Sequence, residues 1–146
     1  MKKFVKLFFL IIWLIVIFNF SSQSGMTSGE LSNSILRKIG YFLRVADPEA
    51  FVLQYETIFR KFAHFSEYFI LGFLAYICLE EFIKNKLIII TIILCVLYAI
   101  SDEYHQMYVV GRVFGAFDIF IDSVGAYCGS TFIHLLKIEC FQEKKQ

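Results

Sequence analysis

The chain has 146 residues, of which 58% are hydrophobic and 18% are aromatic, and its formal net charge is +1. Soluble domains average about 45–50% apolar residues, so this composition favours a single domain, residues 1–146, that resides in a membrane. Because no basic patch dominates the sequence, nucleic acid is excluded as an expected partner.

The first predicted element is a membrane span over residues 4–20. This segment is almost wholly apolar and would be about 25 Å long as a helix. The alternative is a cleaved signal peptide, in which Lys2 and Lys3 precede the apolar run and the small residues of "SQSG" at 22–25 follow it. Signal peptides have apolar cores of about 7–15 residues, so we expect the longer segment to be retained as a span.

The loop over residues 21–61 is expected to be helical. "TSGE" at 27–30 fits a capping box at a helix start. Asp47 and Pro48 predict the start of a second helix, which would run directly into the next span. Two amphipathic helices at the membrane surface account for the apolar spacing of this loop.

Three more spans are predicted over residues 62–82, 87–107 and 117–136. The third begins with 14 purely apolar residues, which are too few to cross a bilayer unaided. Its helix must therefore continue through the polar segment 101–106, unless the bilayer boundary lies there. The expected fold is an all-α membrane protein with four transmembrane helices and an outer amphipathic helical loop.

Basic residues orient these spans. The positive-inside rule puts the side richer in lysine and arginine in the cytoplasm. One side holds Lys2, Lys3, Lys6, Lys84, Lys86, Lys137, Lys144 and Lys145, and the other, over a much longer length, holds Arg37, Lys38, Arg44, Arg60, Lys61 and Arg112. We therefore expect both termini in the cytoplasm and the 21–61 loop outside.

Polar side chains gather on three spans at the outer ends. On a helical projection, Arg60, Lys61, His64, Glu67 and Tyr68 fall within about 120°. On the third span Ser101, Asp102, His105 and Gln106 cover about 140°, with Glu103 at the margin. On the fourth, Asp118, Asp122, Gly125 and Gly129 form a stripe about 60° wide. The two glycines allow another helix to approach closely. Ionisable residues at membrane depth are costly, so this set predicts a functional site.

Several chemistries remain open for this site. The candidate catalytic residues are His64, Glu67, Asp102, Glu103 and His105, and the candidate binding residues are Lys61, Tyr68, Ser101, Gln106, Arg112, Asp118 and Asp122. Two histidine–carboxylate pairs, His64 with Glu67 and His105 with Asp102, are each three residues apart and could meet on one helical face. Together with Asp118 they could bind a divalent metal, although the spacing assigns neither the metal nor any other cofactor. Acid–base chemistry, a Ser101–His105 nucleophile and recognition of a lipid phosphate by the basic residues are further alternatives. In a purely structural alternative, the charges form buried ion pairs that fix helix packing.

Four segments carry a resemblance to a known family. "FSSQS" at 20–24, "RKFAHFSEYFILG" at 60–72, "SDEYHQMYVVGR" at 101–112 and the D-x-x-x-D-x-x-G pattern from Asp118 resemble the VanZ-like family of bacterial membrane proteins. The family signature falls on Lys61, His64, Glu67, Tyr68, Ser101, Asp102, Glu103, His105, Gln106, Arg112, Asp118 and Gly125. Where this chain has Asp122 the family usually has asparagine, so this chain adds a charge there.

The resemblance implies a small multi-pass protein of the bacterial cell membrane, in a broad family whose namesake is linked to low-level resistance to teicoplanin. We expect the outer polar pocket to bind or act on a cell-envelope component, such as a lipid-linked cell-wall precursor or a phospholipid. A membrane hydrolase or transferase with a histidine–carboxylate site is the first alternative, and a non-catalytic scaffold is the second.

Overall fold

The computed structural model describes the backbone of residues 2–143 and the side chains of residues 3–139. Lys144 and Lys145, used above for orientation, lie outside the described residues. The helices are α1 (Lys2–Ser21), α2 (Gly25–Phe42), α3 (Pro48–Leu79), α4 (Leu87–Gln106) and α5 (Ala116–Glu143). All secondary structure within residues 2–143 is helical, which confirms the predicted fold class.

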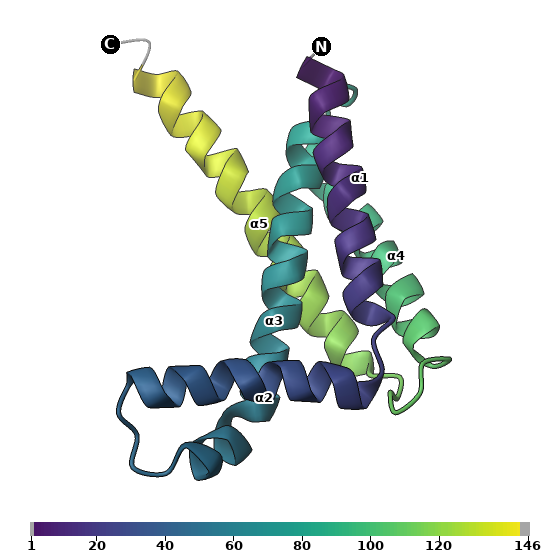
Figure 1. Cartoon of the computed structure of the whole chain (residues 1–146). Coiled ribbons are helices and arrows are strands. Elements are labelled where there is room, and N and C mark those ends of the chain that lie inside the picture. Colours follow the sequence, from purple (N-terminus) through teal and green to yellow (C-terminus); the bar gives the residue numbers. More distant parts are fainter. Residues whose placement is uncertain (1, 144–146) are drawn as a thin grey trace.

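Four of these helices are long and apolar enough to cross a membrane, as predicted: Lys3–Ser21, Pro48–Leu79, Leu87–Gln106 and Ala116–Glu139. Figure 1 shows the start of α1 and the end of α5 at one end of the molecule, here called the terminal end. At the opposite end α2 lies across the bundle, and this is called the α2 end. The helix α4 continues through the polar segment 101–106, which confirms that interpretation.

The helix α3 joins the loop to the second span. Asp47 caps its first turn by accepting hydrogen bonds from the backbone N–H groups of Glu49 and Ala50, both at 3.1 Å. The helix ends at Leu79 rather than at residue 82. At this end the Glu80 and Glu81 carboxylates accept hydrogen bonds from Lys6 Nζ at 3.0 and 2.5 Å, which ties the end of α3 to α1.

The predicted start of α2 was wrong by one helical turn. The cap is Ser24, whose hydroxyl accepts a hydrogen bond from the Thr27 N–H at 3.1 Å, so "TSGE" lies inside the helix. The earlier start is supported by a backbone hydrogen bond from the Gly25 N–H to the Val110 carbonyl, at 3.0 Å. A Cβ on Gly25 would lie 2.0 Å from the Gly111 carbonyl oxygen, so α2 begins directly against the loop that follows α4.

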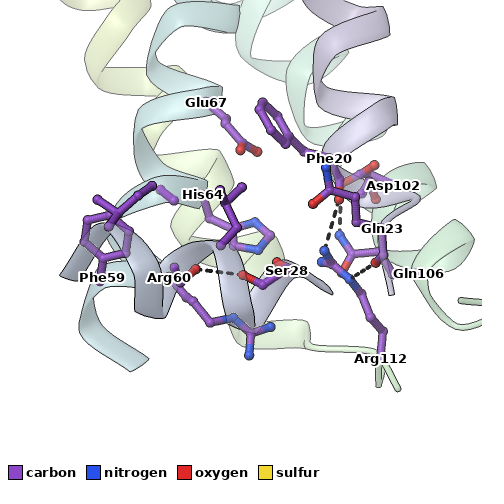
Figure 2. A pocket seen from close by; sticks show the side chains of 15 residues that line it. Phe20, Gln23, Ser28, Phe59, Arg60, His64, Glu67, Asp102, Gln106 and Arg112 are labelled. Atoms are coloured by element: carbon purple, nitrogen blue, oxygen red, sulfur yellow. Dashed lines mark hydrogen bonds between the residues drawn. The ribbon is translucent and has the colours of Figure 1, made fainter. Parts of the chain in front are cut away.

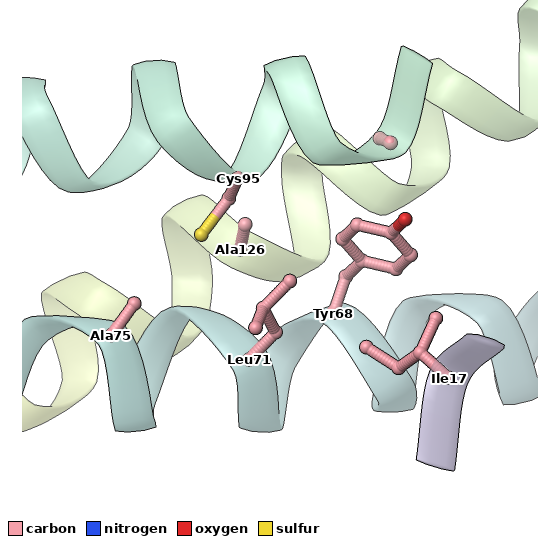
Figure 3. Packing of buried hydrophobic residues seen from close by; sticks show 7 residues of the cluster. Ile17, Tyr68, Leu71, Ala75, Cys95 and Ala126 are labelled. Atoms are coloured by element: carbon pink, nitrogen blue, oxygen red, sulfur yellow. The ribbon is translucent and has the colours of Figure 1, made fainter. Parts of the chain in front are cut away.

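The core surrounds α3, which contacts the four other helices. Its buried cluster takes side chains from every span (Figure 3): Ile17, Tyr68, Leu71, Ala75, Cys95, Ala99 and Ala126. The α3 and α5 backbones are in close contact, because a Cβ on Gly125 would lie 2.4 Å from the Phe65 oxygen and one on Gly129 would lie 1.9 Å from the Phe69 oxygen. The predicted role of this glycine pair in close helix packing is confirmed.

Candidate functional site

A pocket of about 210 Å³, here called the main pocket, lies at the α2 end of the bundle. Its walls come from the end of α1, from α2, α3 and α4, and from the loop after α4 (Figure 2). The polar lining residues are Ser21, Gln23, Ser28, Ser32, Arg60, His64, Glu67, Asp102, Gln106 and Arg112, and the apolar ones are Phe20, Leu31, Ile35, Phe59 and Ala63. The pocket is therefore amphipathic, with α2 supplying much of its apolar wall.

Five predicted site residues meet at this pocket: His64, Glu67, Asp102, Gln106 and Arg112. Figure 2 shows the Glu67 carboxylate and the His64 ring on the α3 side, facing Asp102, Gln106 and Arg112 across the cavity. The helix α3 places the first two one turn apart on the same face. The convergence of two carboxylates, an imidazole, an amide and a guanidinium gives the pocket both hydrogen-bond donors and acceptors.

Arg112 connects three parts of the pocket wall. Its guanidinium donates to the carbonyls of Gln23 and Phe20, both at 3.0 Å, and to Gln106 Oε1 at 2.9 Å. Burial, with the nearby positive charge of Arg60, lowers the pKa of Arg112, but an arginine remains charged at neutral pH. The sequence assigned Arg112 to ligand binding, and in the structure its guanidinium joins Phe20, Gln23 and Gln106 at the pocket wall.

Asp102 and Gln106 continue this network. Gln106 Nε2 donates to Asp102 Oδ2 at 3.2 Å while its Oε1 accepts from Arg112. Both side chains are buried, and they lie one turn apart on α4. A buried carboxylate needs such partners, because an unpaired charge at this depth is costly.

His64 lies next to a carboxylate from another helix. Its Nδ1 is 3.4 Å from Asp122 Oδ1, and Asp122 is fully buried on α5. The sequence suggested a pairing of His64 with Glu67 on the same helix. His64 and Glu67 both line the pocket, but the carboxylate that His64 Nδ1 approaches is that of Asp122, which lines neither cavity.

A second cavity, of about 130 Å³, adjoins the first. It is lined by Thr57, Arg60, Lys61, His64 and Asp118, so Arg60 and His64 line both cavities. Lys61 forms an ion pair with Asp118, as the structural interpretation of these charges anticipated. Arg60 makes no side-chain hydrogen bond or ion pair with residues 3–139.

Besides Asp122, four predicted site residues line neither cavity. Glu103 is fully buried and accepts a hydrogen bond from the Gly115 N–H at 2.8 Å, so it holds the start of α5. Tyr68 is part of the core. His105 stacks on Phe18, and its Nε2 lies 3.1 Å from Ser22 Oγ.

Ser101, the fourth, is exposed and donates to the Tyr98 carbonyl of its own helix at 2.7 Å. The hydroxyl next to His105 is therefore that of Ser22, and the Ser101–His105 pairing considered from the sequence is not formed. Over the described side chains, no group of three or more His, Cys, Asp or Glu residues is arranged to hold a metal ion.

Sequence reasoning missed the walls contributed by α1 and α2. Phe20 at the end of α1 and Gln23 in the turn after it line one side of the pocket, and Ser28 and Ser32 line it from α2. A signal was present, because residues 20–24 belong to the segments that carry the family resemblance. Polar residues in this segment are also typical of an ordinary loop, so their place beside α3 and α4 could be recognised only from the fold.

The VanZ/LLP1 family model matches residues 5–137 of the chain. Neither the curated proteins nor the solved structures contain a match to this chain. The matched region includes the two cavities and the four candidate spans, except for residues 3–4 of the first span and 138–139 of the last. The chain therefore belongs to the VanZ/LLP1 family.

Proposed function

We propose that this chain is a single-domain protein of the bacterial cell membrane, with both termini in the cytoplasm and its α2 end outside. Its main pocket binds a phosphate-bearing cell-envelope component, either a lipid-linked cell-wall precursor or a phospholipid. Through this binding it changes the susceptibility of the cell to teicoplanin-type antibiotics.

The observation that carries this proposal is the amphipathic pocket under α2. A cavity of about 210 Å³ at the end of four apolar helices brings together polar groups that are costly to keep near lipid. Leu31, Ile35 and Phe59 provide an apolar side, and His64, Glu67 and Asp102 provide a polar side. The head group of an outer-leaflet lipid, which carries methylene groups beside its hydrogen-bonding groups, matches both sides, and this supports an envelope component rather than a soluble metabolite.

The proposal predicts a measurable change in the cell envelope. Lipids and cell-wall precursors from cells with and without the chain are compared by mass spectrometry, and teicoplanin susceptibility is measured in the same strains. Glu67→Gln and Asp102→Asn are expected to remove at least about 90% of any difference, because each keeps its volume but loses a charge in the pocket. Ser101→Ala is the control, since its exposed hydroxyl contacts only its own helix.

Two outcomes would contradict this. If both amide variants kept the full difference in envelope composition and susceptibility, the pocket carboxylates would not be needed for the effect. Degradation of both variants, with Ser101→Ala stable, would favour the scaffold alternative, in which the charges serve only packing.

The orientation can be tested separately with two engineered cysteines. Ala46→Cys lies in the exposed α2–α3 loop, and Asn85→Cys lies in the exposed turn between α3 and α4. We expect a membrane-impermeant maleimide to label the first in intact cells and the second only after lysis. The chain without either substitution measures the background from its own cysteines. Reversed labelling would overturn the assignment of the termini to the cytoplasm.

A second candidate function, a hydrolase or transferase, is favoured by the contact between His64 and Asp122. A buried carboxylate at 3.4 Å from Nδ1 could orient the ring and leave Nε2 to act as acid or base in the pocket. If so, Asp122→Asn is expected to slow turnover of the envelope component by about 100-fold while leaving its binding within about twofold. Equal turnover in Asp122→Asn and the unmodified chain would exclude this role for Asp122.

A further inference from the structure

We propose that the two cavities form one binding site for a phospholipid-type ligand, with the phosphate held in the smaller cavity and a hydrogen-bond-donating head group in the main pocket. This inference rests on the proposed function and names the ligand class for that site. It assigns the phosphate to Thr57 and Arg60, and the head group to the carboxylates of Glu67 and Asp102.

The smaller cavity has the chemistry of a phosphate site. Its volume of about 130 Å³ is roughly ten times what one water molecule requires, so it has room for a phosphate. Because Lys61 and Asp118 neutralise each other in their ion pair, the positive charge of Arg60 is left in excess. Arg60 has its guanidinium donors free of contacts within residues 3–139, and a guanidinium can bind two phosphate oxygens at once. The Thr57 hydroxyl adds a neutral donor.

The smaller cavity also adjoins an apolar surface suited to a lipid tail. Lys61 Nζ lies 5.5 Å from the centre of the Phe117 ring, and this ring stacks on Phe120 with centres 6.2 Å apart. Phe117 and Phe120 are 63% and 61% exposed, and the exposed residues Val124 and Tyr127 follow at helical spacing along α5. An acyl chain that leaves the phosphate can follow this row of side chains into the bilayer.

The main pocket determines which head group the lipid can carry on the side of the phosphate opposite the tail. Arg60 and His64 line both cavities, so a phosphate beside them can have its tail on one side and its head group on the other. The main pocket offers the Glu67 and Asp102 carboxylates, which accept hydrogen bonds. Apart from Arg60, the guanidinium that lines the main pocket is that of Arg112, which is already bound to three protein oxygens. The favoured head group therefore carries hydroxyl or ammonium donors and not further acidic groups.

The test is native mass spectrometry of the full chain purified in detergent and titrated with defined lipids. Phosphatidylethanolamine and phosphatidylglycerol carry head-group donors, whereas phosphatidylcholine carries none. We expect one molecule of either donor-bearing lipid to be retained with about tenfold higher affinity than phosphatidylcholine. Inorganic phosphate at millimolar concentration is the arm that tests for a soluble anion, and we expect it not to displace the lipid.

Matched variants locate the phosphate. Arg60→Gln and Lys38→Gln each remove one positive charge from the α2 end, but Lys38 is exposed and lines neither cavity. Arg60→Gln is expected to weaken lipid retention about tenfold, and Lys38→Gln to leave it within about twofold. Thr57→Val, which leaves every charge in place, should weaken retention by about threefold and provides a second measurement if Arg60→Gln does not fold.

Several outcomes would overturn the inference. Equal effects of Arg60→Gln and Lys38→Gln would mean that the lipid is held by general surface charge. If phosphatidylcholine were retained as well as the donor-bearing lipids, the head group would not be recognised by the carboxylates of the main pocket. Displacement by inorganic phosphate would identify a soluble anion site. If lipid retention fails these tests while Glu67→Gln still abolishes the envelope difference, the proposed function stands and only the ligand class is wrong.

Discussion

Replacing Gly129 by alanine is expected to destabilise the folded chain by about 2–3 kcal/mol, although it adds a single methyl group. A Cβ at this position would lie 1.9 Å from the Phe69 carbonyl oxygen, which belongs to the backbone of α3. Neither helix can yield locally, because Gly125 makes a similar approach to the Phe65 oxygen one turn away. The added methyl group must therefore move α3 and α5 apart along their whole interface. This interface includes the contact between His64 and Asp122.

The measurement is the midpoint of unfolding in detergent, by heat or by titration with sodium dodecyl sulfate. Gly29→Ala is the matched control, because a Cβ there would meet only the Glu56 side chain, at an ordinary 3.6 Å. This second change should be neutral or stabilise α2 by about 0.5–1 kcal/mol, since alanine is the better helix former. Equal midpoints for the two variants would show that α3 and α5 are not in backbone contact.

Features that depend on one helix at a time could be predicted from the sequence. The spans, the continuous helix from Pro48, and the extension of α4 through residues 101–106 all follow from local patterns of apolar and capping residues. The close approach of another helix at Gly125 and Gly129 could also be predicted, because small residues four positions apart indicate a packing face. The spacing does not indicate which helix packs there.

Pairing between helices could not be predicted in the same way. A helical projection gives the direction of a side chain around its own axis, but not which neighbouring helix lies in that direction. The projection therefore indicated a pairing of His64 with Glu67 and of His105 with Ser101. In the structure His64 approaches Asp122, and His105 approaches Ser22. The start of α2 was misplaced because several residues in 21–28 can cap a helix, and the contact between Gly25 and the Val110 carbonyl favours Ser24.

Arg112→Lys is expected to destabilise the chain by about 2–3 kcal/mol even though it keeps the positive charge. The guanidinium reaches three acceptors in different directions: the Gln23 and Phe20 carbonyls at the end of α1, and Gln106 on α4. A lysine ammonium cannot match this planar fork, so at least one half-buried carbonyl would lose its partner. The loop after α4 would then be held to the α1–α2 junction mainly through the backbone contact of Gly25 with Val110.

The unfolding midpoint separates this role from ligand binding, which the sequence alone had suggested for Arg112. Arg44→Lys is the control, because Arg44 is exposed and makes no side-chain hydrogen bond within residues 3–139. If Arg112 acted only on a bound ligand, its lysine variant would lose affinity yet unfold at the same midpoint as the Arg44 variant. A lower midpoint for Arg112→Lys than for Arg44→Lys, measured without added lipid, would instead show that Arg112 holds the pocket wall together. In that case Arg60 is the arginine left to meet an anionic ligand, because its guanidinium is the one at the pocket with no protein partner in the described part of the chain.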